Sequence, residues 1–179
     1  MGRTVISENS SPLAIPPIRP IGVIRTPFPN AAGTPIQSAV AGGTEGRVEL
    51  LAEFAEGLRD LDGFERIWLI YSFDRAAEQQ LVVTPYLDVV EHGVFATRAP
   101  ARPNRIGMSA VRLLAIRVTT LIVADVDMLD GTPLLDIKPY VPAFDSFLVG
   151  KVGWFDGLRT EGAVADGRFE RGANDPTGE

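Results

Sequence analysis

The residues best suited to chemistry in this sequence are the arginines of one short segment with two prolines. Residues 93–109 read GVFATRAPARPNRIGMS. Four polar donors are concentrated there: Arg98, Arg102, Asn104 and Arg105. No Asp or Glu occurs between His92 and Ala124, although the chain as a whole is acidic. Planar guanidinium groups pair well with carboxylates and phosphates. The segment can therefore hold an anionic ligand or a ribose, and a solvated proline turn explains the same residues equally well.

A second segment, residues 130–142, reads DGTPLLDIKPYVP. Asp130-Gly131 between two apolar runs predicts a hairpin, because glycine readily adopts a positive φ. This turn offers a carboxylate and backbone groups to a ligand, yet taken alone it is also an ordinary structural turn. Residues 136–140, DIKPY, taken alone indicate a strand end with a salt-bridged Lys138.

Several common catalytic arrangements are missing from the sequence. No G-x-G-x-x-G motif follows a strand, and there is no phosphate loop with a trailing Lys-Ser or Lys-Thr. There is no cysteine, and His92 is the single histidine, which argues against a zinc site and a Ser-His-Asp triad. We expect His92 to be solvated or hydrogen-bonded, and we expect no metal. What remains is a site for a compact ligand of mixed polarity.

Length and composition predict one globular domain. The chain has 179 residues, of which 45% are hydrophobic and 22% charged. Its net charge of −6 does not favour binding to a polyanion, so any nucleic-acid contact must use a local basic patch. Five arginines lie in the acid-free stretch and can form one: Arg98, Arg102, Arg105, Arg112 and Arg117. We find no apolar run long enough to span a bilayer and no export signal, so we expect a cytoplasmic protein.

The coarse pattern of the chain is that of many short strands with tight turns and one short helix. Strand-like runs occupy residues 21–25, 66–73, 81–84, 93–97, 110–118, 121–128 and 134–140, and residues 48–51 fit either a strand or a helix start. Phe54, Leu58 and Leu61 are spaced for one short amphipathic helix over residues 52–61, weakened by Gly57. The pattern predicts a mainly β fold, an antiparallel barrel or sandwich, over alternating βαβ units.

The two ends of the chain are expected to lie outside the folded unit. Residues 1–17 are rich in Ser and Pro and predict a flexible arm. Residues 159–179 are rich in Gly and charge and predict a loosely ordered tail. The domain is therefore expected to span residues 18–158.

Three blocks of the sequence resemble the TsaA/YaeB family, also called TrmO, of S-adenosylmethionine-dependent tRNA methyltransferases. They are IGVIRTPF at residues 21–28, the 93–109 segment with FATR and RPNRIG, and DGTPLLDIKPY at residues 130–140. The resemblance covers most of residues 21–145. It implies a small single-sheet β-barrel without a Rossmann fold, usually dimeric, that binds S-adenosyl-L-methionine as methyl donor and acts on tRNA.

The resemblance also implies roles for individual residues. The donor-contacting positions that it implies are Gln37, Arg102, Leu113, Asp130, Gly131, Thr132 and Pro133, and residue chemistry adds Arg98 as a partner for a carboxylate and Phe95 as an apolar wall. Acceptor-side positions are Asp74, Arg75, Asn104, Arg105 and Lys138. Methyl transfer from a sulfonium needs mainly alignment and desolvation. If the acceptor is an exocyclic amine, Asp136 or Tyr140 is the candidate to help remove its proton.

Three departures from the family pattern bear on the acceptor. Asp74-Arg75 stand where the tRNA enzymes tend to have His-Gln, Arg105 replaces the proline of RPNPIG, and Ser38-Ala39 replace a Pro-Gly. The resemblance favours N6-methylation of threonylcarbamoyl-adenosine at position 37 of tRNA. The alternatives are a methyltransferase of the same fold acting on a small molecule or another RNA, and a non-catalytic S-adenosylmethionine-binding protein.

Overall fold

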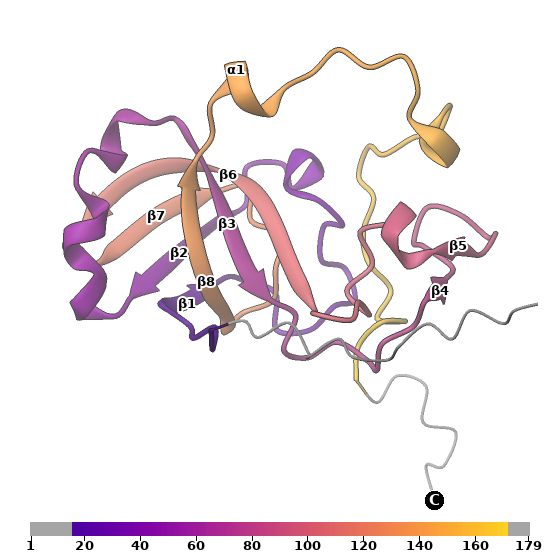
Figure 1. The fold of residues 1–179 in the computed structure, drawn as a ribbon, viewed down its shortest axis with the longest axis horizontal. Helices are drawn as coiled ribbons and strands as arrows, with labels where there is room; N and C mark the ends of the chain where they lie inside the picture. Colours follow the sequence, from indigo (N-terminus) through magenta and orange to yellow (C-terminus); the bar gives the residue numbers. More distant parts are fainter. Residues whose placement is uncertain (1–15, 172–179) are drawn as a thin grey trace, which may run out of the picture.

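The protein is built around a closed barrel of six antiparallel strands (Figure 1). The computed structural model describes residues 16–171. Around the barrel the strands are β1 (Gly22–Arg25), β2 (Glu45–Leu50), β7 (Thr120–Ala124), β6 (Ile106–Arg117), β3 (Arg66–Ser72) and β8 (Thr132–Pro139), and β8 closes onto β1. The mainly β fold class predicted from the sequence is confirmed. Residues 48–51, which the pattern left open, belong mostly to strand β2.

The barrel is filled by one face of each strand. Burial alternates residue by residue along β3, so that Ile67, Leu69 and Tyr71 point inward. Aliphatic side chains of the other strands complete the core: Ile24, Val48, Val111, Leu121, Val123 and Leu134. The period-2 apolar pattern of these strands therefore specifies which face is buried.

The corner at Asp130-Gly131 is not the hairpin that the sequence suggested. The run before it, β7, pairs with β2 and β6, whereas β8 pairs with β1 and β3. Gly131 does have the expected positive φ, 83°. The chain therefore turns at this point to cross from one side of the barrel to the other, and the strands on either side are not neighbours. In contrast, β6 and β7 do form the hairpin predicted at Thr119-Thr120.

The predicted amphipathic helix takes a tighter form. Residues Ala52–Leu58 form a 3-10 helix, η2, followed by a second one, η3, at Leu61–Gly63. Leu58 and Leu61 are buried, as the spacing predicted. Short 3-10 helices also lie at Ser38–Val40 (η1), Val94–Ala96 (η4) and Gly153–Phe155 (η5), and the one α-helix in residues 16–171 is α1, Pro142–Asp145. No helix in that range has the length and apolar character needed to cross a membrane.

A smaller lobe lies beside the barrel, on the right of Figure 1. Its two-stranded sheet joins β4 (Val82–Val83) and β5 (His92–Gly93), and five buried residues form its core: Val83, Val94, Ala99, Ala101 and Phe169. Because Phe169 comes from near the C-terminus, this core cannot form without the last part of the described chain.

The sequence predicted a loosely ordered tail from residue 159, and the structure holds its described part in place. The N–H of Gly33 donates to Ala165 O at 2.9 Å, and the N–H of Ala77 donates to Phe169 O at 2.8 Å. The C-terminal segment, residues 153–171, thus joins the loop after β1 to the loop after β3. Of the arm predicted at residues 1–17, residues 1–15 lie outside the described range, as do residues 172–179 of the predicted tail.

Candidate functional site

The two segments singled out in the sequence meet at one cavity at the end of the barrel where β8 begins. This corner cavity is lined by Tyr71, Phe73, Asp74, Arg75, Ala76, Pro100, Asp127, Met128, Leu129, Thr132, Phe169 and Glu170. Pro100 belongs to the arginine-bearing segment and Thr132 to the corner, so the two segments converge within a single chain. The lining combines carboxylates and an arginine with aromatic and aliphatic walls, which suits a ligand of mixed polarity.

The corner itself is held by hydrogen bonds to the end of β1. The N–H groups of Asp130 and Gly131 donate to Phe28 O at 2.7 Å and to Ile24 O at 2.8 Å. The Oδ1 atom of Asp130 accepts a hydrogen bond from the N–H of Thr26 at 3.1 Å. The corner is therefore a fixed element whose backbone groups are largely occupied.

The four corner residues face different ways. Thr132 is buried and lines the corner cavity, with its hydroxyl donating to Leu129 O at 2.8 Å. The side chain of Asp130 lines a separate, more open cavity on the β1–β2 side, where its Oδ2 atom lies 3.9 Å from Nη1 of Arg25. Pro133 pairs with Val23 of β1. In the protomer, only part of the corner therefore faces the corner cavity.

Arg75, predicted on the acceptor side, is a clamp on two backbone carbonyls. Its Nη1 donates to Pro29 O at 2.8 Å, and its Nη2 donates to Asp130 O at 2.7 Å. The neighbouring Asp74 is exposed and lines the corner cavity. Of these two residues, Arg75 thus supports the corner, and Asp74 carries a carboxylate in the lining of the corner cavity.

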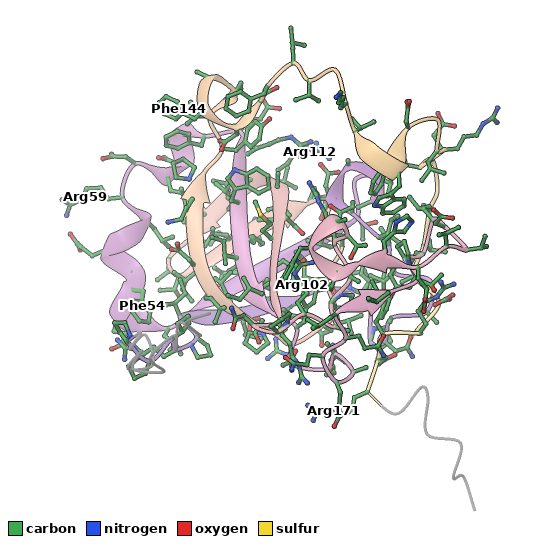
Figure 2. All side chains as sticks on the ribbon, turned by 45° about the vertical axis from the view of Figure 1, so that its right-hand side comes forward. Phe54, Arg59, Arg102, Arg112, Phe144 and Arg171 are labelled. Carbon is green, nitrogen blue, oxygen red and sulfur yellow. The ribbon has the colours of Figure 1, made fainter. Side chains whose placement is uncertain are left out.

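The arginines of the 93–109 segment are also anchored. Nη1 of Arg102 donates to Val94 O at 3.0 Å and to Thr97 O at 2.8 Å, and its guanidinium lies 5.9 Å from the centre of the exposed Phe95 ring. Figure 2 shows Arg102 beside the smaller lobe, away from Phe54 and Arg59 at the other side of the barrel. Arg102 therefore shapes the loop, and Arg98 is the arginine that reaches another element.

Arg105 has an unusual backbone conformation, with φ of 49°. Its N–H donates to Arg102 O at 3.2 Å, and its carbonyl accepts the N–H of Phe73 at 2.7 Å, which ties the loop to the end of β3. A proline ring fixes φ near −65°. The backbone conformation found at position 105 is therefore incompatible with the proline of the RPNPIG pattern. The adjacent Asn104 is exposed.

Of the predicted site residues, only Asp74, Arg75 and Thr132 line the corner cavity, and four others lie elsewhere on the barrel. Leu113 packs against the barrel core. Asp136 and Lys138 form an ion pair at 2.8 Å, and Tyr140 packs on Trp68 with ring centres 5.6 Å apart. Along β8, Tyr140 is about 26 Å beyond Thr132 at the usual strand rise.

Sequence reasoning missed a buried polar cluster at the base of the corner cavity. The hydroxyls of Tyr71 and Ser109 lie 3.1 Å apart, and Asp127 is next to them. Oδ1 of Asp127 is the one buried side-chain polar atom without a hydrogen-bond partner within residues 16–171. Burial raises the pKa of Asp127 to about 6, against the effects of the Ser109 hydroxyl, the Ser38 N–H and the charge of Arg98. Burial, with the Asp127 charge, also raises the pKa of Tyr71.

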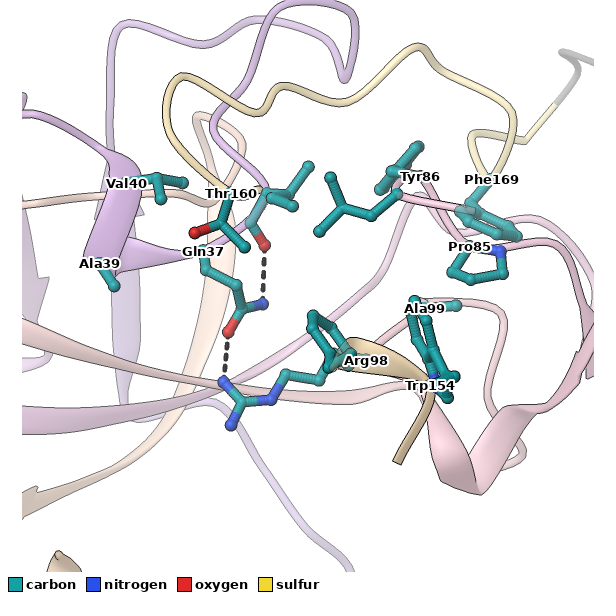
Figure 3. Close-up of a pocket in the computed structure, with 13 residues that line it drawn as sticks. Gln37, Ala39, Val40, Pro85, Tyr86, Arg98, Ala99, Trp154, Thr160 and Phe169 are labelled. Carbon is teal, nitrogen blue, oxygen red and sulfur yellow. Dashed lines mark hydrogen bonds between the residues drawn. The ribbon is translucent and has the colours of Figure 1, made fainter. Parts of the chain in front are cut away.

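A second cavity, the aromatic cavity, adjoins the smaller lobe (Figure 3). It has a volume of about 210 Å³. Its lining comes from three loops and the C-terminal segment: Ile36, Gln37, Ala39, Val40, Pro85, Tyr86, Leu87, Arg98, Ala99, Trp154, Phe155, Thr160 and Phe169. Phe169 lines both cavities. Gln37 and Arg98, both predicted to contact the donor, are hydrogen-bonded to each other at one end of it.

Within the described chain, no group of three His, Asp or Glu residues is arranged to hold a metal ion.

The sequence profile of the tRNA-methyltransferase O N-terminal domain matches residues 23–146. The chain belongs to the tRNA-methyltransferase O family. Its TrmO-type barrel is similar to the crystal structure of TrmO from Pseudomonas aeruginosa, with a TM-score of 0.70 and 38% identity over 82% of this chain and 66% of that one. The predicted resemblance is thereby confirmed, including the barrel without a Rossmann fold.

Relatives of this chain carry two kinds of description. A probable S-adenosyl-L-methionine-binding protein of Pyrococcus abyssi is 52% identical over 84% of this chain and 83% of its own length. The tRNA (adenine(37)-N6)-methyltransferase of Escherichia coli is 36% identical over 70% of this chain, which spans 58% of the enzyme. The residues matched to the family end at 146, so the C-terminal segment that lines both cavities lies beyond them.

Proposed function

We propose that this protein is an S-adenosyl-L-methionine-dependent methyltransferase that methylates N6 of adenosine 37 in tRNA, with threonylcarbamoyl-adenosine as the acceptor. The observation that carries the proposal is the convergence of the arginine-bearing segment and the DGTP corner on one cavity in a TrmO-type barrel. A tRNA acceptor also agrees with the cytoplasmic location expected from the sequence.

The residues around the corner cavity suit the methyl donor, which has an apolar adenine face, polar ribose and amino-acid groups, and a sulfonium charge. Phe73, Met128 and Leu129 offer apolar walls, and Asp74 offers a carboxylate. Gln37 and Arg98, which the sequence assigned to the donor, line the aromatic cavity and not the corner cavity, so the proposed donor site does not use them. When bound, the donor supplies an already activated methyl group, so the side chains around the corner cavity need only orient it and exclude water.

Two predicted roles need a second copy of the chain. Asp136, near the end of β8, and Tyr140, just after it, come before a segment, residues 144–152, that arches away from the barrel (Figure 1). Phe144, Phe147 and Leu148 in it are 74%, 77% and 107% exposed. Contiguous exposed apolar side chains mark an interaction surface. We propose a homodimer through this segment, which would place Asp136, Lys138 and Tyr140 beside the partner.

The methyltransferase proposal is tested with the full chain, S-adenosyl-L-methionine and tRNA lacking the methyl group, followed by nucleoside mass spectrometry. We expect a gain of one methyl group on threonylcarbamoyl-adenosine, and activity that weakens steeply with salt. Product on another RNA or a small molecule would support the same chemistry with a different acceptor.

Light scattering of the protein and of Leu148→Asp tests the dimer, which the added charge should dissociate.

A second candidate is a non-catalytic protein that binds S-adenosyl-L-methionine. It is favoured by the description of the Pyrococcus abyssi relative, which names binding alone. Tight donor binding in calorimetry, without a methylated product from any tRNA pool, would support it over the enzyme.

A further inference from the structure

The aromatic cavity has the features of a site for a flat heterocycle. Its walls include the rings of Tyr86, Trp154, Phe155 and Phe169, and its far end carries the Gln37 amide and the Arg98 guanidinium (Figure 3). We propose that this cavity binds the purine base that accepts the methyl group, stacked on Phe155 with its polar edge toward Gln37 and Arg98. This inference rests on the proposed function, because it assigns the acceptor subsite of the same enzyme.

The aromatic wall is fixed before any ligand arrives. Trp154 stacks on His92 with ring centres 4.6 Å apart and planes at 17°, and Phe155 lies 4.1 Å from Trp154. The indole Nε1 donates to Ala96 O at 2.8 Å, and His92 is held by Asp88 at 3.0 Å. The fold therefore already holds these rings in place, so a base that stacks on Phe155 does not have to immobilise them. Stacking on aromatic side chains is a general way to hold an unpaired base.

The polar end can match the edge of a purine. Nε2 of Gln37 donates to Ile36 O at 2.7 Å, and its Oε1 accepts from Nη1 of Arg98. These two contacts orient the amide, which keeps one N–H and one lone pair for a ligand. Arg98 is exposed and has further N–H donors. A base edge that presents both donors and acceptors would therefore be satisfied here.

The position of the cavity fits an acceptor. It shares Phe169 with the corner cavity, where we place the donor, and Arg98 is close enough for its charge to act on Asp127, which lines the corner cavity. Adjacent sites for donor and acceptor are what an in-line transfer requires, since the nucleophile must approach the methyl group opposite the sulfur. Trp154 and Phe155 lie beyond residues 23–146, which the family profile matches, and belong to the C-terminal segment.

The test uses the full chain, an anticodon stem-loop RNA carrying threonylcarbamoyl-adenosine, and the variants Phe155→Ala and Trp154→Phe. Phe54→Ala serves as the matched control, because Phe54 lies in η2, whose residues line neither cavity, and packs under Arg19. We expect Phe155→Ala to raise the KM for the RNA about ten-fold, in line with the loss of one stacking partner, while the donor Kd from calorimetry stays within about two-fold. The control should change neither quantity.

Intrinsic fluorescence separates failure of this inference from failure of the proposed function. The chain has two tryptophans, and Trp68 packs on Tyr140 outside both cavities. The RNA should quench the emission that Trp154→Phe removes, even if no methyl group is transferred. A donor Kd that rises ten-fold in Phe155→Ala, with the KM for RNA unchanged, would assign the cavity to the donor and overturn the inference. Unchanged binding of both, or no quenching by the RNA, would also overturn it.

Discussion

Arg75 donates a hydrogen bond from Nη2 to the backbone carbonyl of Asp130 at 2.7 Å, across 55 residues of sequence. Its Nη1 binds Pro29 O at the same time, so one side chain joins the loop after β1, the loop after β3 and the corner before β8. The residue that departs from the family's His-Gln pair has thus become part of the support of the corner.

Replacing Arg75 with Ala is expected to loosen the corner, because two carbonyls lose a charged donor that holds them together. We expect the donor Kd in calorimetry to rise about ten-fold, equivalent to about 1.4 kcal/mol. Arg59→Ala is the control, since Arg59 is exposed and pairs with the exposed Glu56, on the other side of the barrel. Equal donor affinity in both variants would show that the corner keeps its shape without the clamp.

Gly107 is expected to tolerate no side chain. A Cβ there would lie 2.3 Å from Cε2 of Tyr71 and 2.8 Å from Cζ of Phe73, and Gly107 pairs with Tyr71 across β3 and β6. Gly107→Ala should lower the free energy of unfolding by about 1–3 kcal/mol, as overpacking of a filled core does. Gly57→Ala, where a Cβ would meet nothing within 4 Å, should be neutral or stabilising in the same urea titration.

Asp125 is expected to stabilise the fold at neutral pH and to lose that contribution in acid. Burial acts to raise its pKa, but the hydrogen bonds from Arg112 and Arg66, at 3.0 and 2.9 Å, outweigh burial and lower the pKa. The stability that Asp125 contributes is therefore fully present above its unfolded pKa of about 3.9. It falls as the pH drops toward the lower pKa of the folded state. Asp125→Asn should cost about 2 kcal/mol at pH 7, and progressively less below pH 4. Asn also accepts the φ of 69° found there, so the backbone is matched.

Asp127, two residues further along, is expected to show the opposite pH dependence. Its folded pKa of about 6 lies above the unfolded value, so stability is lost as the pH rises from about 4 to about 6. Asp127→Asn should be more stable than the parent by about 1–2 kcal/mol at pH 8, and this advantage should vanish near pH 4. Urea titrations across pH 4–8 measure both variants; a parallel profile for the two aspartates would contradict the assignment.

The strands were predictable because their apolar residues alternate, as along β3, and the apolar face of such a strand must be buried in the core. Their order around the barrel was not, since β1 pairs with residues more than a hundred positions away and no local pattern encodes that contact. The Asp130-Gly131 turn shows the limit: its positive φ was read correctly, but the partner of the strand that follows was not.

The candidate site was predictable only where unusual residues cluster, as in the 93–109 and 130–142 segments. Asp127 could not be predicted, because a single acidic residue beside a turn has no distinctive spacing in the sequence. Its raised pKa depends on burial next to Tyr71 and Ser109, which only the fold brings together. The C-terminal segment was missed because Phe169 is an isolated aromatic among glycines and charges, and the loops it joins supply its hydrogen bonds.

The position of Phe169 has a consequence for truncated chains. All six barrel strands lie before residue 140, whereas Phe169 belongs to the C-terminal segment. Without Phe169 the smaller lobe loses a ring of its core, and both cavities lose part of their lining. A chain cut before residue 169 would therefore keep every barrel strand and still have two incomplete cavities.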